Sequence, residues 1–592
     1  MNENLELEYC FQGKTKDVFR QLNMLKLTTG WLASLLFITN AWANISLEIK
    51  GLDGALKTNV DAYLSAISEQ DYSTSLRFQS RLRDNISNAL RALGYYQPEI
   101  QFLVSEDKKL VTITINRGEP VIIEESDIHI LGMAGEDEEF IQLVEKSGLN
   151  KGEVLDHGKY DSLKSSLRNL ALSKGYFNGD FSKTVLEVSP ELEQAFVHLH
   201  YKSGIRFRFG DTIISGSQIE LEKVRSLIPY KKGDPYLSSD VGLFNQRLSN
   251  TEWFSSVFVQ PDISHIGEGE SLPMQVTLSP QSKNQIETGI GYSTDIAVKG
   301  TLKWKKPWVN SLGHSFDSSL SLSKPEQTVI VGYQIPLEDV LNEYYRFQYG
   351  MKYEDKQDTE SLETNAVVER HWQLDSGWHR TVYFRFLHEN FTQGAQDDEL
   401  MMLLPGFSFS KVKTSGGSMP MFGNKQSIAL EFSDKYLTSR ARIFRVLGKS
   451  AWIRSLGNNH RGLVRLDASA NVVDDVKDVP PSIRFFAGGD NSLRGYDYES
   501  ISPTDETGAL IGAKFMASST LEYQYRLVEN WWMAAFVDYG DAWNETADWK
   551  MGTGFGVRWA SPVGPIRLDF AWGLAEVGAE QFKIHFTLGP EL

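Results

Sequence analysis

Hydrophobic and polar residues alternate one by one through the second half of the chain. In the stretch Ser427–Ser433, Ile428, Leu430 and Phe432 alternate with small or polar residues. Similar segments of about ten residues or more, separated by turns, recur from residue 285 to the end. Because aromatic residues flank most segments, the pattern is typical of a transmembrane β-barrel with a polar lumen. A soluble β-sandwich would show the same alternation and stays as an alternative.

Sixteen strands are predicted in this half. Because the number is even, the first strand begins and the last strand ends on the same side of the membrane. Their expected starts lie near residues 285, 298, 314, 327, 344, 363, 378, 402, 425, 440, 460, 511, 531, 550, 564 and 581. The eleventh and twelfth strands are joined by a loop over 473–510. A connection of this length is usually functional or disordered.

The first half of the chain repeats a different pattern. Short apolar segments end in glycine at Gly51, Gly132 and Gly216, about 80 residues apart, and helical stretches follow them. Each repeat ends in strand-like sequence. We therefore expect three tandem α+β modules, at 44–118, 119–204 and 205–280, followed by a barrel over 281–592.

The N-terminus carries a predicted export signal. Residues 24–43 combine a positive end at Lys26, an apolar centre and the small-x-small sequence Ala41-Trp42-Ala43. Residues 1–23 are expected to be a start-site extension. The single cysteine, Cys10, precedes the cleavage site, so the exported chain would carry no thiol. A buried or anchoring helix is the alternative for this apolar run.

Composition excludes several classes of protein. A mean hydropathy of −0.31 argues against a bundle of transmembrane helices, and a formal net charge of −17 argues against a nucleic-acid partner. Gly448-Lys449-Ser450 lacks the leading glycine of a phosphate loop, and no nucleophile elbow occurs, so no enzyme activity or cofactor is expected. His198 and His200 share one strand face without a third ligand nearby in sequence, so no metal site is expected either.

The long loop contains the sequence Leu493-Arg494-Gly495-Tyr496. On the thirteenth strand Phe536, Asp538 and Gly540 share a face, and the alternation points Asp538 into the lumen. The planar fork of Arg494 is suited to grip that carboxylate if the loop folds inward. A solvated loop arginine fits the spacing equally well, so both interpretations stay open. Further lumen charges are expected at Arg558, Arg567 and Asp569.

The modules, the barrel, "LRGY", "FVDYG" and "SPVGPIRLDFAWG" together resemble the POTRA-barrel superfamily of outer-membrane assembly and secretion proteins. With three modules and the ending "QFKIHFTLGPEL", the chain looks most like the TamA family, the outer-membrane subunits of the translocation and assembly module. The resemblance implies that the long loop is a lid whose Arg-Gly-Tyr tip enters the barrel and meets the Phe-x-Asp-x-Gly strand. Leu493 departs slightly from the family, which often has valine there.

The resemblance also implies a place and partners for the protein. The barrel would lie in the lipid bilayer of a Gram-negative outer membrane, with the modules in the periplasm. A TamB-type periplasmic protein anchored in the inner membrane would be its partner, and outer-membrane barrels such as autotransporters its clients. A two-partner secretion pore and a phospholipid-transport conduit remain as alternatives.

The first and last strands, which must close the barrel, both have features of weak strands. Glycines on the lumen face weaken the first strand, and a proline ends the last one. An opened seam would expose backbone groups to which a client strand could pair. The alternative is that the glycines only relieve curvature. The expected lateral gate consists of Ile286, Glu287, Gly289, Gly291, Phe582, Ile584, Phe586, Leu588, Gly589 and Pro590.

Overall fold

The computed structural model describes residues 45–588 apart from 266–269, 357, 418, 438, 562–563 and 575–580. The expected signal peptide and start-site extension lie outside the described residues, as do Gly589 and Pro590. Within the described part of the chain, no helix is both long enough and apolar enough to cross a membrane.

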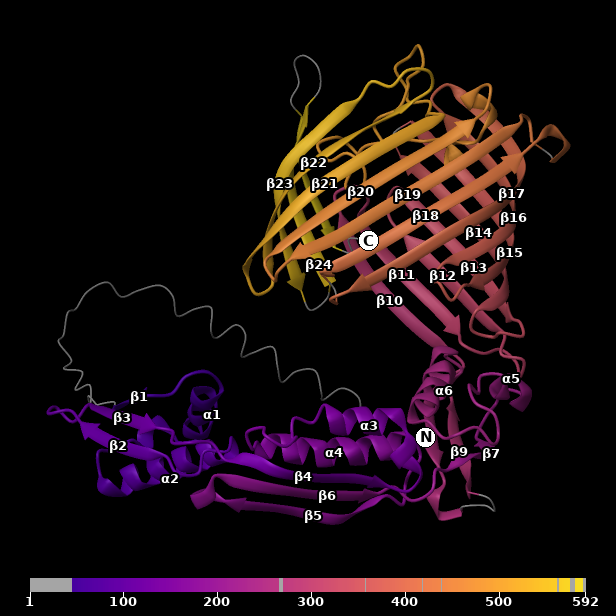
Figure 1. The fold of residues 1–592 in the computed structure, drawn as a ribbon. Coiled ribbons are helices and arrows are strands. Elements are labelled where there is room, and N and C mark those ends of the chain that lie inside the picture. The colour runs from indigo at the N-terminus through magenta and orange to yellow at the C-terminus, as the bar shows by residue number, and fades with distance from the viewer. Residues whose placement is uncertain are drawn as a thin grey trace, which may run out of the picture. The chain divides into compact units, whose positions relative to one another are not determined.

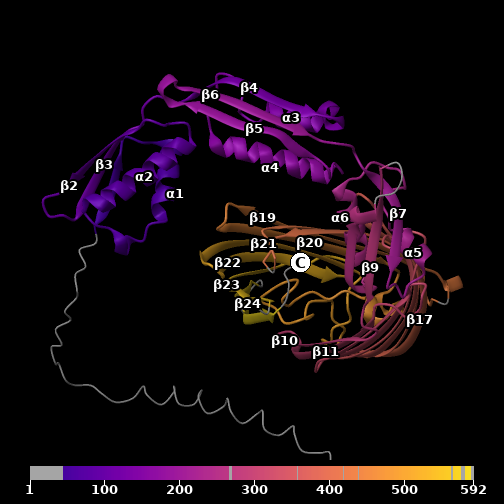
Figure 2. The ribbon, with the colours of Figure 1, turned by 90° about the horizontal axis from the view of Figure 1, so that it is seen from below.

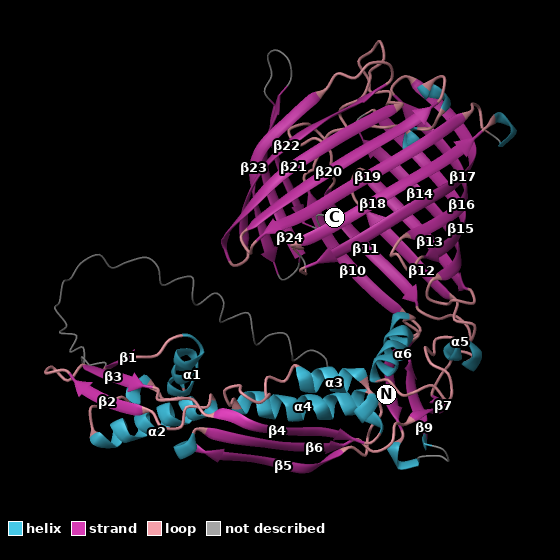
Figure 3. Ribbon diagram, in the orientation of Figure 1, coloured by secondary structure: helices cyan, strands magenta, loops and turns pink. Residues whose placement is uncertain are grey.

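The N-terminal half contains three small sheets, each of three strands with helices beside it (Figures 1 and 3). The first sheet has the order β1-β3-β2, with β1 parallel to β3. Its amphipathic helix α2 is capped by Ser75, whose hydroxyl accepts from the Phe78 amide, and it buries Leu82, Ile86 and Leu90. The elements are β1 (Ser46–Lys50), α1 (Gly54–Ser65), α2 (Leu76–Ala92), β2 (Glu99–Val104) and β3 (Leu110–Asn116).

The second sheet has the order β4-β6-β5. Along β6 every second residue, Ala195, Val197 and Leu199, is buried in the core, so His198 and His200 lie on the opposite face. The elements are β4 (Ile122–Leu131), α3 (Glu138–Glu145), α4 (His157–Ser173), β5 (Asp180–Ser189) and β6 (Gln194–Lys202).

The third sheet, of order β7-β9-β8, belongs to the same compact unit as the barrel. Its core extends to Val340 in a barrel turn, and the Trp253 indole donates to the Gly313 carbonyl of another turn at 3.1 Å. The sheet is therefore docked on one end of the barrel. The elements are β7 (Arg208–Ser215), α5 (Leu221–Arg225), α6 (Ser238–Asn250), β8 (Phe254–Pro261) and β9 (Ser271–Pro280).

The glycines that end the first strand of each repeat now have a structural reason. Gly51 and Gly216 have φ of +90° and +78°, a region that favours glycine. A Cβ at either position would also overlap a backbone carbonyl oxygen, that of Ile115 or Leu278, in the neighbouring strand of the same sheet. The repeat in the sequence therefore marks a repeated close approach of two backbones.

The second half of the chain forms a closed barrel of sixteen antiparallel strands in sequence order, β10 to β25. The predicted strand number is confirmed, and the sandwich alternative is wrong. Tyr345, Phe347, Tyr349 and Met351 alternate outward on β14 as expected for a lipid-facing surface. The strands are β10 (Gln285–Ser293), β11 (Ala297–Lys306), β12 (Ser315–Leu322), β13 (Glu326–Pro336), β14 (Glu343–Lys356), β15 (Thr359–Gln373), β16 (His379–Gln393), β17 (Gln396–Ser415), β18 (Phe422–Ser433), β19 (Ile443–Leu456), β20 (His460–Val472), β21 (Phe515–Val528), β22 (Trp531–Trp543), β23 (Lys550–Ser561), β24 (Gly564–Leu574) and β25 (Gln581–Leu588).

The seam between β10 and β25 is much shorter than the other strand pairings. Among the described residues, Ser293 and Thr587 are its single residue pair. Next to them the Thr294 amide donates to the Phe586 carbonyl at 3.2 Å. On its other side β10 pairs with β11 along its whole length, from Gln285 to Ser293. The barrel is therefore closed at this point by about one rung of the β-ladder.

The position of that rung follows from the topology. Strand β10 begins after the third sheet and ends at Ser293, so the rung lies at the barrel end away from that sheet. Strand β20 runs in the same direction as β10, because alternate strands of an antiparallel barrel are parallel. The connection from β20 to β21 therefore leaves the barrel at the end that carries the rung.

Candidate functional site in the barrel lumen and at the seam

The long connection between β20 and β21, residues 473–514, folds into the barrel; we call it the inserted loop. Its trace crosses the interior of the ring of strands in Figure 2. Phe485, Leu493, Tyr496 and Ile501 of the loop are buried together, in a cluster that includes Ala542 of β22. Apolar contacts thus hold the middle of the loop against the barrel wall.

Arg494 at the tip of this loop is 1% exposed, and the carboxylate of Asp538 accepts hydrogen bonds from three of its donors. Its Nε and Nη2 atoms donate to the two oxygens of Asp538 at 2.7 and 2.9 Å. The Arg494 backbone amide also donates to Asp538, at 3.1 Å. This is the forked arginine–carboxylate geometry, with a backbone donor added. The guanidinium carbon lies 3.4 Å from the centre of the Phe536 ring, which adds a cation–π contact.

Two further carboxylates join Arg494 to a second buried arginine. Nη1 of Arg494 lies 2.7 Å from Glu522 and 3.3 Å from Asp569. Arg558 contacts the same two acids, at 2.8 and 2.6 Å. We call Arg494, Asp538, Glu522, Asp569 and Arg558 the lumen charge network. Its two guanidiniums offset two of the three carboxylate charges, which lowers the cost of burying the group.

The structure places the other predicted lumen residues near this network. Gly540 is in contact range of Leu493, since a Cβ at Gly540 would lie 2.8 Å from Leu493 Cδ1. Arg567 is buried, but its Nε has no hydrogen-bond partner among the described residues. Arg567 is not among the residues that form hydrogen bonds with Arg494. The sequence prediction had no role for Glu522, although its inward position on β21 was available from the alternation.

Glycines of the wall make room for the tip of the inserted loop. Gly495 has a φ of +96°, which favours glycine. A Cβ on Gly552 of β23 would overlap the carbonyl oxygen of Arg494. The loop backbone therefore touches the wall backbone directly, and the glycine at 552 leaves room for this contact.

The inserted loop also bridges the two strands of the seam. Asp490 accepts from His585 Nδ1 at 2.6 Å and from the Thr587 hydroxyl at 2.9 Å, both on β25. The Asp490 amide donates to Asp295, in the turn after β10, at 2.8 Å. The Gly495 amide donates to His585 Nε2 at 3.0 Å. We call Asp295, Asp490, His585 and Thr587 the seam clasp.

The tautomer of His585 follows from these contacts. Nδ1 faces an acceptor and Nε2 faces a donor, which fits a neutral imidazole with its proton on Nδ1. Burial and the charge of Asp490 raise the pKa of Asp295 to about 6. Burial alone would raise the pKa of Asp490 as well, but its hydrogen bond from His585 lowers it below the usual range.

The residues of the expected lateral gate are only partly brought together. Phe586 lies beside the rung, with its ring centre 5.7 Å from that of Tyr292. Ile286, Phe582 and Ile584 are exposed on the outer surface. Gly289 and Gly291 are half-buried on the inner side, and Glu287 pairs with Lys303 of β11 at 3.0 Å. Within the described residues, β10 has no partner strand on its seam side between Gln285 and Tyr292.

Comparison with known proteins identifies the family. Residues 266–591 match the profile of the Omp85 superfamily domain, more than half of the chain. The chain belongs to the Omp85 superfamily. Residues 46–117 match a second profile, POTRA domain TamA domain 1. Membership in the Omp85 superfamily places the barrel in the outer membrane of a Gram-negative bacterium.

Individual relatives of this Omp85 chain are distant. The outer membrane protein assembly factor BamA of Nitratidesulfovibrio vulgaris is 23% identical over 369 residues, which are 58% of this chain and 46% of the relative. The chain thus spans about half the length of that relative. The crystal structure of BamA from Haemophilus ducreyi lacking POTRA domains 1-3 has a TM-score of 0.67 at 15% identity and covers 79% of this chain and 99% of that one. CdiB from Acinetobacter baumannii has a TM-score of 0.44 at 14% identity, covering 91% of this chain and 99% of that one.

The anchoring of the Omp85 barrel's inserted loop can be tested with Arg494→Ala, which leaves three carboxylates with one guanidinium. We expect this variant to lose about 3–5 kcal/mol of loop docking, the usual cost of removing one partner from a buried ion pair. Channel recordings in planar bilayers should show larger and more frequent openings. Lys477→Ala, which removes an exposed cation of the same loop, should conduct like the wild type. Equal conductance of all three proteins would contradict the anchoring.

The close backbone approach at Gly552 predicts a second way to displace the loop. Gly552→Ala places a methyl group where the Arg494 carbonyl lies, so the loop tip must withdraw, and conductance should rise without any change of charge. The matched control is Gly300→Ala on β11, where a Cβ would meet nothing within 4 Å. If both alanine variants stay closed, the tip does not depend on this contact.

The raised pKa of Asp295 predicts a pH dependence of the seam clasp. A carboxyl whose pKa is higher in the docked state favours docking when protonated, and this contribution is lost as pH rises through about 6. Channel opening should therefore increase from about pH 4, the ordinary range of an aspartate, and level off a little above pH 6. The Asp295→Asn side chain is uncharged at every pH, so the part of the pH dependence that comes from this residue should be absent in the variant. The difference between the two pH profiles is the measurement, because other groups titrate in both proteins. Parallel profiles would show that Asp295 is not involved.

Proposed function

We propose that this protein is a TamA-type insertase of the outer membrane, which assembles client barrel proteins through a lateral gate between β10 and β25. The observation that carries the proposal is the seam, which within the described residues is joined by about one rung and is bridged by the inserted loop. A barrel that only had to stay closed would gain from pairing along whole strands. The short pairing instead favours a wall that opens.

The unpaired part of β10 is suited to receive a client strand. Its seam-side backbone groups between Gln285 and Tyr292 lack a partner strand among the described residues. An edge of this kind binds an extended segment by main-chain hydrogen bonds, largely independent of side chains. This part of the seam is also the part nearer to the third sheet. A client that arrives from the side of the third sheet would meet it first.

The rest of the proposal follows from the family resemblance. All three N-terminal sheets are proposed to be POTRA modules in the periplasm, and the match of residues 46–117 to a TamA POTRA profile supports the first. A TamB-type protein anchored in the inner membrane is the proposed partner, and autotransporter-like barrels are the proposed clients. The mechanism needs no enzymatic step, because strand exchange breaks and forms only non-covalent bonds.

The experiment that tests the gate is a disulfide across the rung. Ser293→Cys with Thr587→Cys joins the residue pair that the described part of the seam contains, and the chain has no other cysteine after Cys10. Oxidation should stop client assembly in cells, and reduction should restore it. Client assembly is scored by heat-modifiable migration of a newly made autotransporter barrel.

The matched control joins a continuous part of the wall. Ser321→Cys with Thr328→Cys links a similar serine–threonine pair between β12 and β13, and it should assemble clients in either redox state. The two single-cysteine seam variants control for loss of the Thr587 contact with Asp490. If the locked seam assembles clients normally, cargo passes by another route, and a secretion pore or a lipid conduit would replace the gate.

A further inference from the structure

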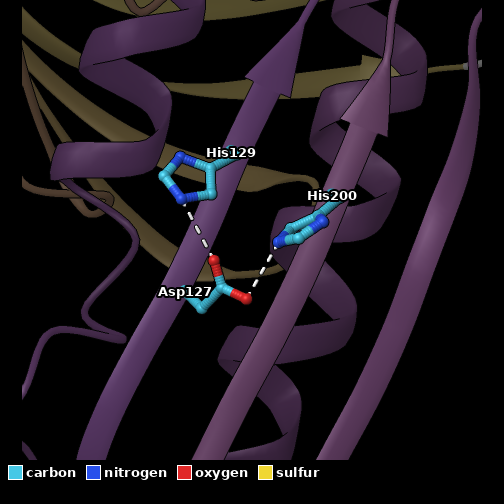
Figure 4. Close-up of side chains that lie close together, drawn as sticks. All are labelled: Asp127, His129 and His200. Carbon is cyan, nitrogen blue, oxygen red and sulfur yellow. Dashed lines mark ion pairs between the residues drawn. The ribbon is translucent and has the colours of Figure 1, made fainter.

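Four side chains gather on the open face of the second sheet, far in sequence from the barrel. Asp127 and His129 lie two residues apart on β4, and His198 and His200 lie two residues apart on the adjacent strand β6. Residues two apart share a face of a strand. This face is opposite to the buried core residues of β6. Figure 4 shows Asp127 between His129 and His200, with both rings turned toward the carboxylate.

The distances between the polar atoms of these side chains are close to the distances between ligands in a metal site. Asp127 Oδ1 lies 3.1 Å from His129 Nε2, and Oδ2 lies 2.9 Å from His200 Nε2. One potential ligand atom from each of the three residues lies within 4.8 Å of the others. Two ligands of one tetrahedral Zn²⁺ are about 3.3 Å apart, given bonds of about 2.0–2.1 Å. Small side-chain rotations, without any strand movement, cover the difference.

The hydrogen bonds of the apo protein leave one of these atoms unsatisfied. His200 Nε2 is shielded from solvent and has no hydrogen-bond partner among the described residues, because its approach to Asp127 is poorly aligned. A buried polar atom without a partner is unusual and suggests a missing ion or water.

We propose that Asp127, His129 and His200 form a binding site for a divalent transition metal of the zinc class. Imidazole nitrogens with one carboxylate suit Zn²⁺, Co²⁺, Ni²⁺ and Cu²⁺, whereas Ca²⁺ and Mg²⁺ prefer oxygen ligands throughout. His198 Nδ1, 2.9 Å from Asp127 Oδ2, would orient the carboxylate from outside the coordination sphere. Three protein ligands leave a fourth position for water or for a group of a binding partner.

Other features of the site agree with an accessible metal. His129 is 64% exposed, so the site opens to solvent. Lys183 on β5 lies 3.5 Å from Asp127 Oδ2 and is the one cation paired with this carboxylate besides histidine, within the described residues. Its side chain is 40% exposed and is free to turn outward when a cation binds. A bound ion would link β4 to β6 by coordination in addition to the backbone ladder.

The sequence alone could not show this site. His198 and His200 were recognisable as neighbours on one strand face, but their partners lie about 70 residues earlier, as the separation of 71 between Asp127 and His198 shows. Asp127 and His129 are therefore candidate ligands that the residues close to His198 and His200 in the sequence did not offer. Only the sheet order, which puts β4 beside β6, brings the four side chains together.

The test is a zinc titration of the full chain without its signal peptide, purified in detergent with an affinity tag other than polyhistidine. After removal of metals with EDTA, isothermal titration calorimetry with Zn²⁺ should detect one equivalent that depends on this cluster. His129→Ala/His200→Ala should abolish that equivalent, and Asp127→Asn should weaken it at least about tenfold. Titration with Co²⁺ should give the visible absorption of a tetrahedral complex in the wild type only.

The matched control is His265→Ala, which removes an exposed histidine paired with Asp262 at 3.0 Å in the third sheet. It should bind Zn²⁺ like the wild type. Circular dichroism and hydrogen exchange in β6 show whether the double variant is folded, and Asp127→Asn tests the site with less disturbance. Zinc binding that persists in both variants would overturn the proposal. So would an equivalent that disappears instead in Asp490→Asn, because it would belong to the seam clasp, whose Asp295, Asp490 and His585 also lie close together.

Discussion

A guanidinium enclosed by a barrel wall must meet its counter-charges there, because an unpaired charge in a desolvated lumen is too costly to keep. Arg494 satisfies this requirement with Asp538 on two side-chain hydrogen bonds, and with Glu522 and Asp569 on a third nitrogen. The three acids come from β21, β22 and β24. Arg494 contacts all three acids in the observed position of the inserted loop, so the charge network stabilises the loop there.

The position of the loop in turn determines how the barrel closes. With the Arg494 tip fixed, Gly495 lies against His585, and Asp490 reaches both β25 and the turn after β10. These contacts lie beside Ser293 and Thr587, the one residue pair of the seam among the described residues. Lumen and seam are therefore one connected structure, and a movement of the loop changes both. The barrel can be closed and weakly paired at the same time because a loop, rather than a long ladder, holds its seam.

The sequence could predict the features that depend on local pattern. The alternation of residues such as Tyr345 and Phe347 was sufficient for the number and order of strands, and the inward position of Asp538 made it a candidate partner for Arg494. Glu522 was missed, although its neighbour Leu521 faces outward, because several inward charges were available and strand register decides among them. The seam clasp was missed because Asp490 and His585 are 95 residues apart and meet only after the barrel closes. The same limit applies to the metal cluster, whose members come from strands that are adjacent in space but not in sequence.

The free energies of the loop contacts and of the seam hydrogen bonds decide whether such a seam would open without a client. Withdrawing the loop separates Arg494 from its acids, which costs about 3–5 kcal/mol if nothing replaces the contacts. One rung of the ladder adds two backbone hydrogen bonds at most, each worth about 0.5–1.5 kcal/mol net. The closed state is thus favoured by several kcal/mol when the barrel is alone.

A client strand that pairs along β10 from Gln285 to Tyr292 would form several backbone hydrogen bonds, of similar total free energy. The two states come into balance only when a client is bound, because a ligand shifts an equilibrium by no more than its preference for one state. In the proposed mechanism the inserted loop would keep the membrane sealed between clients, and the client itself would supply the free energy that opens the gate.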